Sequence, residues 1–220
     1  RNSAESEKEM RYMKTAVIGA ALLTAGLMPA AAAYAADTTK IGYGQGLAVD
    51  GENRPTDALA FNERYGSLGA YALSPDRERI LLTFDQGYEN GYTPVILDTL
   101  KEKGAKAIFF LTGDYAMKEP ELVERMIAEG HILGNHGMTH ASLPTLSDSK
   151  ACEEILSLYN YVLSNYGYEM QYFRPPCGEY SERALEIVQD CGYKTVFWSS
   201  AYVDWKTDDQ PSPEEGIQKL

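Results

Sequence analysis

The chain has 220 residues, of which 44% are hydrophobic and 24% charged, and its formal net charge is −12 at pH 7. This composition suits one globular domain with an ordinary core. A strongly acidic protein repels a phosphate backbone, so we expect no nucleic-acid partner, and nothing in the sequence predicts a stable protein partner.

Residues 1–35 have the pattern of a leader followed by a secretory signal. Met13-Lys14-Thr15 precedes the apolar run 16–28, and small residues then lead to a predicted cleavage site after Ala35. We therefore expect export across the cytoplasmic membrane to an extracellular or cell-wall location. The apolar run is short and rich in alanine, and an uncleaved N-terminal membrane anchor is the alternative.

The rest of the chain divides into an N-terminal arm and an α/β domain. Residues 36–75 are rich in Gly, Asn, Pro and Tyr without sustained periodicity, so we predict an arm that wraps the domain. Residues 76–220 alternate between strand and helix patterns. Strands are expected at 80–84, 107–111, 132–135, 171–173 and 194–199, and helices at 93–103, 119–129, 147–166, 182–191 and from Pro213. Repeated βα units imply a parallel sheet or barrel, and because a closed barrel needs more strands, we expect this domain to be incomplete at its C-terminus.

Two of the three histidines, His136 and His140, stand four residues apart just after the third predicted strand. Loops beyond the carboxyl ends of parallel strands converge on one face, and imidazole is a common ligand of divalent cations. The pair is therefore a candidate metal site, and the alternative is that both are loop histidines bonded to backbone. His131 precedes the strand, and we expect it to be structural and to point away from the site.

Charged side chains follow other predicted strands. Asp85 leaves the first strand before a glycine, Arg174 follows the fourth strand at a stiff double proline, and Asp204 comes after the fifth. We expect Arg174 to pair with Asp85 and to keep it ionised and oriented as a base, although each residue taken alone could belong to a simple turn. Trp205 could line a sugar site or merely pack.

The three cysteines are Cys152, Cys177 and Cys191, which allow one internal disulfide at most, and their spacing is not that of a zinc cluster. Cys177 has no adjacent histidine with which to form a nucleophilic pair. Its backbone N–H, rather than its thiol, is the candidate functional group.

Taken in order, four motifs resemble those of the polysaccharide deacetylases, carbohydrate esterase family 4, over about residues 78–205. The family shows T-F-D-D-G, H-[ST]-x-x-H, R-P-P-x-G and D-W. Here they stand as Thr83-Phe84-Asp85-Gln86-Gly87, His136-Gly137-Met138-Thr139-His140, Arg174-Pro175-Pro176-Cys177-Gly178 and Asp204-Trp205. The resemblance implies a distorted (β/α) barrel, metal-assisted hydrolysis of N-acetyl groups, and a divalent cation, zinc by expectation, on the two histidines.

The resemblance also implies individual roles. Asp85 would be the general base, oriented by Arg174, and the Cys177 N–H would bind the oxyanion. Asp204 would orient a general-acid histidine, and Trp205 would contact the substrate.

Within the family, the runs 85–94, 196–199 and 203–206 resemble the delta-lactam-biosynthetic branch, whose members remove the N-acetyl group of muramic acid in spore-cortex peptidoglycan. The expected partner is therefore a peptidoglycan glycan strand. The alternatives are a deacetylase of N-acetylglucosamine polymers and a cell-wall sugar-binding protein without catalysis.

Two features depart from the family pattern. Gln86 stands where most members have a second aspartate as third metal ligand, and a neutral amide offers only a carbonyl oxygen, so weaker metal binding is expected. The L-x-x-H motif that carries the general-acid histidine does not occur in the sequence, and we expect it beyond residue 220.

Overall fold

The computed structural model describes residues 36–76, 78–201, 204, 206, 208 and 210–218, all within the unit Ala36–Leu220. The predicted leader and signal at 1–35, and Trp205, lie outside the described residues. Within the described part of the chain, no helix combines the length and apolar character that a membrane span needs.

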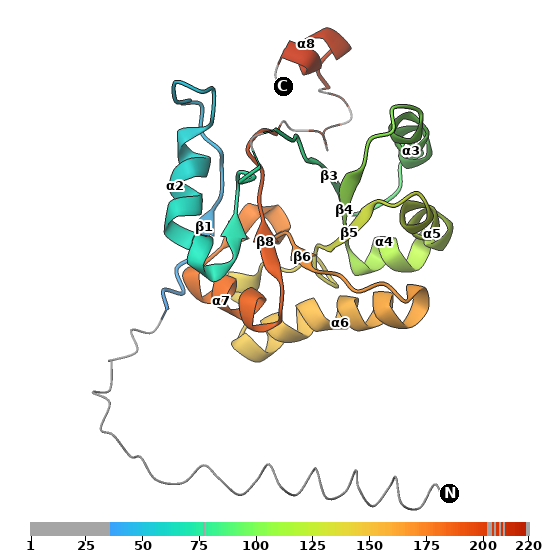
Figure 1. Ribbon diagram of the computed structural model, residues 1–220. Coiled ribbons are helices and arrows are strands. Elements are labelled where there is room, and N and C mark those ends of the chain that lie inside the picture. The colour runs from blue at the N-terminus through green and yellow to red at the C-terminus, as the bar shows by residue number, and fades with distance from the viewer. Residues whose placement is uncertain are drawn as a thin grey trace, which may run out of the picture. The chain divides into compact units, whose positions relative to one another are not determined.

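Six strands form one parallel sheet in the order β2-β8-β6-β5-β4-β3. They are β2 (Ala70–Tyr71), β3 (Leu82–Gln86), β4 (Ala107–Leu111), β5 (Ile132–Asn135), β6 (Tyr172–Phe173) and β8 (Lys194–Val196). A separate antiparallel pair joins β1 (Ile41–Gly42) to β7 (Glu179–Tyr180). Figure 1 shows that the six strands of the parallel sheet form a curved, open sheet with the shape of half a barrel. The predicted α/β class is therefore confirmed.

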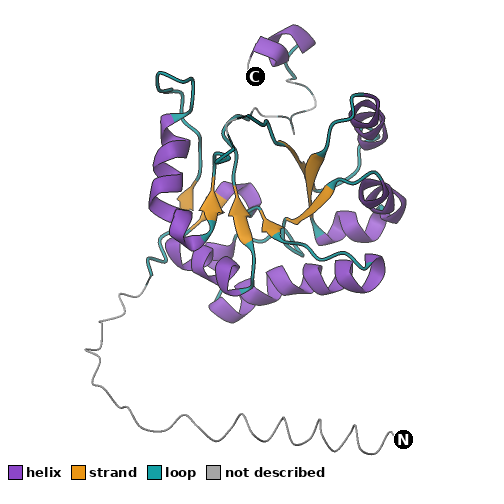
Figure 2. Ribbon diagram, viewed as in Figure 1, coloured by secondary structure: helices purple, strands orange, loops and turns teal. Residues whose placement is uncertain are grey.

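Helices surround the outer face of this curved sheet (Figure 2). They are α2 (Thr56–Tyr65), α3 (Thr93–Glu102), α4 (Gly113–Lys118), α5 (Pro120–Ala128), α6 (Asp148–Tyr166) and α7 (Glu182–Asp190). Helix α8 (Pro213–Gln218) lies apart from them, at the top of the view in Figure 1. The local signals that predicted α6 and α7 act as expected. Gly167 ends α6 with a left-handed φ of 63°, and the Ser181 hydroxyl accepts a hydrogen bond from Ala184 N at the start of α7.

The main core lies between the sheet and helices α3, α5, α6 and α7. All five residues of β4 are buried, as expected for a central parallel strand that is covered on both faces. His131 is part of this core, where its Nδ1 accepts a hydrogen bond from Ala107 N and its ring meets Phe109 edge-on. The prediction that His131 is a structural histidine is confirmed.

The structure differs from the sequence-based expectations at three places. The arm at 36–75 contains α2 and β2, and β2 is an edge strand of the main sheet that pairs with β8. The first strand is β3 at Leu82–Gln86 rather than a buried strand at 80–84, and Ile80 is 89% exposed. Helix α4 was not predicted, although Thr112 caps it by accepting a hydrogen bond from Tyr115 N.

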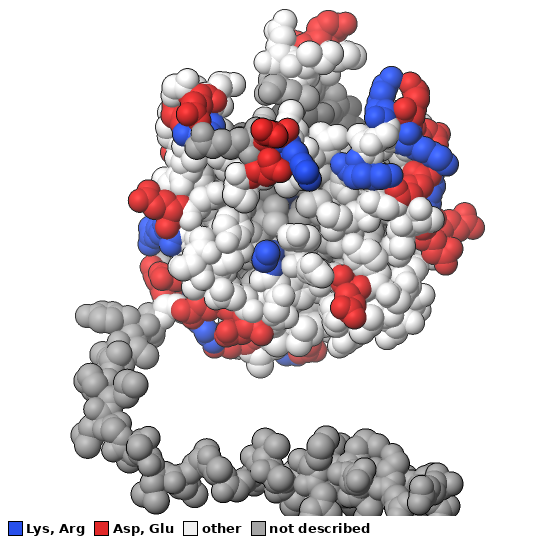
Figure 3. Space-filling model, in the orientation of Figure 1, with Lys and Arg blue, Asp and Glu red and all other residues white. Residues whose placement is uncertain are grey.

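The described surface mixes both signs of charge. On the face drawn in Figure 3, Asp and Glu side chains alternate with Lys and Arg around the margin. The acidic side chains on this face are therefore spread among basic ones and do not form one negative patch.

The structure identifies which cysteines could form the one internal disulfide. The Sγ atoms of Cys152 on α6 and Cys191 at the end of α7 lie 3.3 Å apart, whereas Cys177 is exposed elsewhere. With oxidised glutathione, we expect these two thiols to give up two protons and two electrons to the glutathione disulfide and to form a Cys152–Cys191 bond. Peptide mapping without reductant measures the cross-link. It should persist in Cys177→Ser and vanish in Cys152→Ser, and a cross-link to Cys177 would contradict this assignment.

Candidate active site

Strand alternation selects the side chains that reach the inner face of the curved sheet. Asp85, Phe110 and Gly134 are register partners on β3, β4 and β5, so they form one row across the sheet. Because side chains alternate between faces, His136 and Arg174, which lie two residues beyond Gly134 and one beyond Phe173, point to the same side as Asp85. The carboxyl ends of three strands thus bring Asp85, His136 and Arg174 together.

Arg174 is the centre of this arrangement and is 3% exposed. Its Nη1 donates to Asp85 Oδ1 at 2.8 Å, while Nε and Nη2 donate to the carbonyls of Val196 at 3.1 Å and Phe197 at 2.8 Å. The guanidinium carbon lies 4.3 Å from the centre of the Phe110 ring. Burial lowers the pKa of Arg174 from its usual value, and the Asp85 carboxylate opposes that change. A guanidinium stays charged in proteins, so Arg174 presents a fixed cation to Asp85.

His136 faces the other oxygen of Asp85. Its Nδ1 lies 2.8 Å from the Arg174 carbonyl oxygen, and its Nε2 lies 3.9 Å from Asp85 Oδ2. A carbonyl only accepts, so Nδ1 carries the proton and Nε2 holds the free lone pair. Burial lowers the pKa of His136, against the opposing effect of Asp85, which favours the neutral imidazole that can bind a cation.

His140 meets His136 because the loop between them turns back on itself. The two rings lie edge to face with centroids 4.8 Å apart. The reversal depends on two left-handed residues, Gly137 at φ 84° and His140 itself at φ 62°. Residues other than glycine seldom adopt this conformation, so the surrounding structure must hold His140 there.

The structure holds that loop with Glu154, a residue that was not predicted to be part of the site. Glu154 lies on α6 and accepts hydrogen bonds from Thr139 and Ala141. The sequence did contain a signal for it, because Glu154 occupies the apolar face of α6 beside Ala151, Ile155 and Leu158. An acidic residue on a buried helix face needs partners, and its partners here belong to the histidine loop.

Gln86 lies on the opposite face from Asp85. Its register partners are Leu111, Asn135 and Phe173, and Leu111 and Phe173 belong to the helix-covered core. Its Oε1 accepts a hydrogen bond from the Thr93 hydroxyl at 3.3 Å, at the start of α3. The structure therefore directs the Gln86 side chain to Thr93 rather than to either histidine.

Three further residues were predicted to belong to the site: Asp204, Cys177 and Trp205. Burial raises the pKa of Asp204, and the negative charge of Asp85 adds to that rise, so the two carboxylates lie within electrostatic reach. Cys177 is exposed in the turn after the double proline, with a left-handed φ of 58°. Trp205 lies outside the described residues.

The histidine pair offers ligands that suit a divalent cation. Within the described ranges, no three His, Cys, Asp or Glu side chains are grouped as a metal site. The imidazoles of His136 and His140 do lie side by side, and Asp85 Oδ2 lies 3.9 Å from His136 Nε2. His136 also donates its other ring N–H to a backbone carbonyl, which is the arrangement that orients metal-binding histidines. This donor set fits a cation held by His136 and His140.

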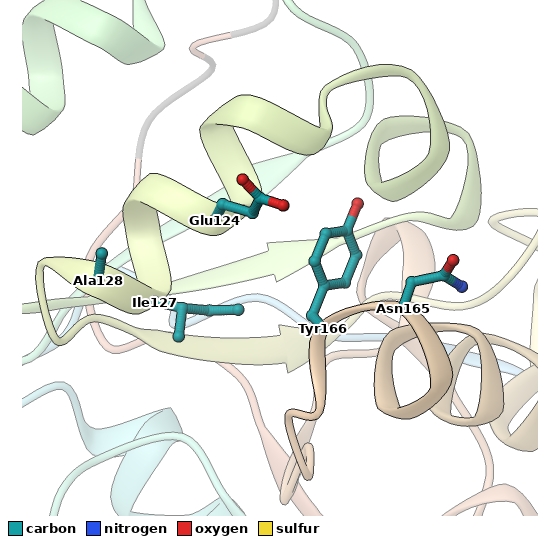
Figure 4. A pocket seen from close by; sticks show the side chains of 5 residues that line it. All are labelled: Glu124, Ile127, Ala128, Asn165 and Tyr166. Atoms are coloured by element: carbon teal, nitrogen blue, oxygen red, sulfur yellow. The ribbon is translucent and has the colours of Figure 1, made fainter.

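A shallow pocket lies elsewhere on the molecule, between α5 and the C-terminal end of α6. Figure 4 shows its lining residues, which are Glu124, Ile127, Ala128, Asn165 and Tyr166. None of them belongs to the group around Asp85, so this pocket is separate from the candidate active site.

Gly134 makes room for the aromatic ring under Arg174. A Cβ atom at Gly134 would collide with the ring of Phe110, its register partner. We expect Gly134→Ala to lower the free energy of unfolding by about 1–3 kcal/mol, because overpacking displaces that ring. Urea unfolding measures this, and Gly42→Ala, where the added Cβ meets nothing within 4 Å, is the control. Equal losses in both variants would show that the Phe110 contact does not matter.

Comparison with known proteins defines the class. Residues 72–196 match the family model described as polysaccharide deacetylase. The chain is 39% identical over 204 residues to the peptidoglycan-N-acetylmuramic acid deacetylase PdaA of Bacillus subtilis, which covers 91% of this chain and 76% of PdaA. The solved structure of PdaA, a family 4 carbohydrate esterase, superposes with a TM-score of 0.76 at 36% identity, covering 83% of this chain and 79% of that one. The chain belongs to the polysaccharide deacetylase family.

Two further relatives show how much of a relative's length the chain spans. It is 44% identical over 168 residues to a 30.6 kDa protein of Geobacillus stearothermophilus, covering 75% of this chain and 63% of that protein. It is 37% identical over 139 residues to a peptidoglycan-N-acetylglucosamine deacetylase of Bacillus cereus, covering 62% of this chain and 50% of that enzyme. The chain thus spans less than two thirds of the length of both proteins.

Proposed function

We propose that this protein hydrolyses the N-acetyl groups of peptidoglycan amino sugars, with N-acetylmuramic acid as its main substrate. One observation carries the proposal. Asp85 is held by the buried Arg174 through one oxygen while its other oxygen lies 3.9 Å from Nε2 of His136. A fixed carboxylate beside a neutral imidazole with a free lone pair suits the activation of a water molecule.

Amide hydrolysis needs an activated water, a polarised carbonyl and a proton for the leaving amine. A divalent cation, zinc in our proposal, would supply Lewis acidity when bound by His136 and His140. Asp85 accepts the proton of the attacking water, and the hydrogen bond from Arg174 Nη1 fixes the orientation of that carboxylate. We leave Gln86 out of the ligand set because its side chain bonds to Thr93.

Three further roles are part of the proposal. The backbone N–H of Cys177 stabilises the developing oxyanion. Asp204 orients the general acid that protonates the amine, as a carboxylate partner fixes an imidazole tautomer. Trp205 offers an aromatic face to a sugar ring.

Similarity to PdaA over 91% of this chain supports muramic acid as the substrate, whereas the N-acetylglucosamine deacetylase of Bacillus cereus matches over 62%. The test is to treat purified peptidoglycan with the protein, to cleave the glycan afterwards with a muramidase, and to locate free amines in the resulting muropeptides by mass spectrometry. Free amines on muramic acid support the proposal. Free amines on glucosamine, or release of acetate from chitin oligomers alone, would favour the alternative substrate, and glycan binding without acetate release would show a sugar-binding protein.

We further propose that the protein is exported through the signal at 1–35 and acts at the cell wall during sporulation. The apolar run with small residues before Ala36 supports export. N-terminal sequencing of protein recovered from the cell wall tests this. A mature chain that starts near Ala36 is expected, and retention of the full N-terminus in the membrane would instead show an anchor.

Metal binding can be tested without activity. We expect His136→Asn to weaken zinc binding by about 100-fold or more, because asparagine keeps a donor for the Arg174 carbonyl but lacks the Nε2 ligand. Calorimetric titration measures the affinity. His131→Asn is the matched control, since an amide oxygen can replace Nδ1 as acceptor for Ala107 N. Equal zinc affinity in His136→Asn and wild type would remove His136 from the metal site.

A further inference from the structure

Glu154 is a buried carboxylate whose hydrogen bonds all run to the histidine loop. It is 8% exposed. Its Oε1 accepts from Thr139 N at 2.6 Å and from Ala141 N at 3.2 Å, and its Oε2 accepts from the Thr139 hydroxyl at 3.0 Å. The backbone carbonyl of Glu154 also accepts from Met138 N at 3.1 Å. One residue of α6 thus binds three positions of the loop, Met138, Thr139 and Ala141, and His140 lies between the last two.

The start of the histidine loop, at Asn135 and Gly137, also packs against α6. A Cβ atom on Gly137 would lie 2.8 Å from Glu154 Oε1, so the carboxylate occupies the space that a side chain at 137 would need. Asn135 accepts from Gly137 N and donates to the Ile155 carbonyl, which ties the start of the loop to the next residue of α6. The left-handed conformation of His140 costs of order 1–3 kcal/mol, and these bonds are what hold it.

We propose that Glu154 is a positioning residue that keeps the His140 imidazole against His136. Its carboxylate accepts from the backbone N–H groups of Thr139 and Ala141, the residues before and after His140, and thereby sets the direction of that side chain. The inference rests on the proposed function for the role of the histidine pair. It adds a residue on α6 whose side-chain oxygens bond to Thr139 and Ala141 rather than to either imidazole.

Three variants separate positioning from simple packing. Glu154→Ala removes every side-chain bond to the loop. Glu154→Gln keeps an oxygen that accepts from Thr139 N and Ala141 N, but its amide group donates and cannot replace Oε2 as acceptor for the Thr139 hydroxyl. Glu153→Ala is the matched control, because Glu153 is the preceding residue on α6 and is an exposed partner of Lys150.

The first measurement is zinc affinity by calorimetry on folded protein. We expect Glu154→Ala to weaken zinc binding by about 10–100-fold, the effect typical of losing a group that orients a ligand. Glu154→Gln should restore most of that loss, and Glu153→Ala should match wild type. A purely structural role predicts a lower melting temperature with unchanged zinc affinity in the folded state, and that result would overturn the proposal.

The second measurement does not depend on metal or activity. In metal-free protein, the imidazole NMR signals of His140 should shift or broaden in Glu154→Ala, while those of His131 stay in place. If Glu154→Ala does not fold, Thr139→Val takes its place, since it removes only the bond to Oε2, and we expect about a tenfold loss of zinc affinity. Wild-type affinity and wild-type His140 signals in that variant would then refute the proposal.

These measurements also distinguish this inference from the proposed function. A wild-type protein that binds zinc but releases no acetate from peptidoglycan would contradict the function, while the Glu154 comparison would remain valid. If wild type deacetylates peptidoglycan and Glu154→Ala retains its zinc affinity and rate, the function stands and the positioning role is wrong.

Discussion

Replacing Asp85 by asparagine should lower kcat/KM for acetate release from peptidoglycan by about 10²–10⁴-fold, the contribution typical of a positioned acid or base. Asparagine has nearly the same shape, and its Oδ1 can still accept the hydrogen bond from Arg174 Nη1. Its amide cannot take a proton from water. The loss should therefore appear in the rate, as measured by acetate release over a range of peptidoglycan concentrations.

Two controls make the Asp85 result specific. Asp114→Asn removes an exposed carboxylate that pairs with Lys118 on α4, and it should leave the rate unchanged. The melting temperature of Asp85→Asn should fall, because the buried Arg174 loses its counter-charge although the asparagine Oδ1 still accepts its hydrogen bond, so the rate is compared on folded protein. A folded Asp85→Asn protein with the wild-type rate would exclude Asp85 as the base.

Replacing Arg174 by methionine should have the largest effect on stability. Methionine fills similar space but leaves the carbonyls of Val196 and Phe197 without their donor, and it leaves Asp85 without its cation. Each buried acceptor without a partner costs about 1–3 kcal/mol, so we expect the free energy of unfolding to fall by about 2–5 kcal/mol. Urea unfolding followed by circular dichroism measures it.

Arg183 provides the comparison for Arg174. Arg183 makes two ion pairs, with Asp148 and Glu186, whereas Arg174 makes one, but the Arg183 side chain is 32% exposed. Pairs at the surface contribute little, so Arg183→Met should cost less than about 1 kcal/mol. If the two variants lose the same stability, burial does not explain the importance of Arg174. Deacetylation should also fall in Arg174→Met alone, because only Arg174 orients Asp85.

Much of the fold and of the site could be predicted because the relevant signals are local. The apolar run of β4, the left-handed Gly167 after α6 and the Ser181 cap of α7 are each readable within a few residues. The same holds for the polar residues that follow each strand. Parallel strands place such residues on one edge, which is why Asp85, His136 and Arg174 were predicted together.

The sequence by itself determined most strands and helices between residues 82 and 196, the family, and the chemical groups at the strand ends. The tertiary structure alone decided three other features. It placed β2 in the sheet, because a two-residue strand has no readable period and its partner, β8, lies more than 120 residues away in the chain. It directed the Gln86 side chain to Thr93. Gln86 lies in one row with Leu111 and Asn135, and this strand register places its side chain on the helix-covered face of the sheet. It joined Glu154 to the histidine loop, because hydrogen bonds between distant segments form only when the packing of a helix on a sheet brings them together.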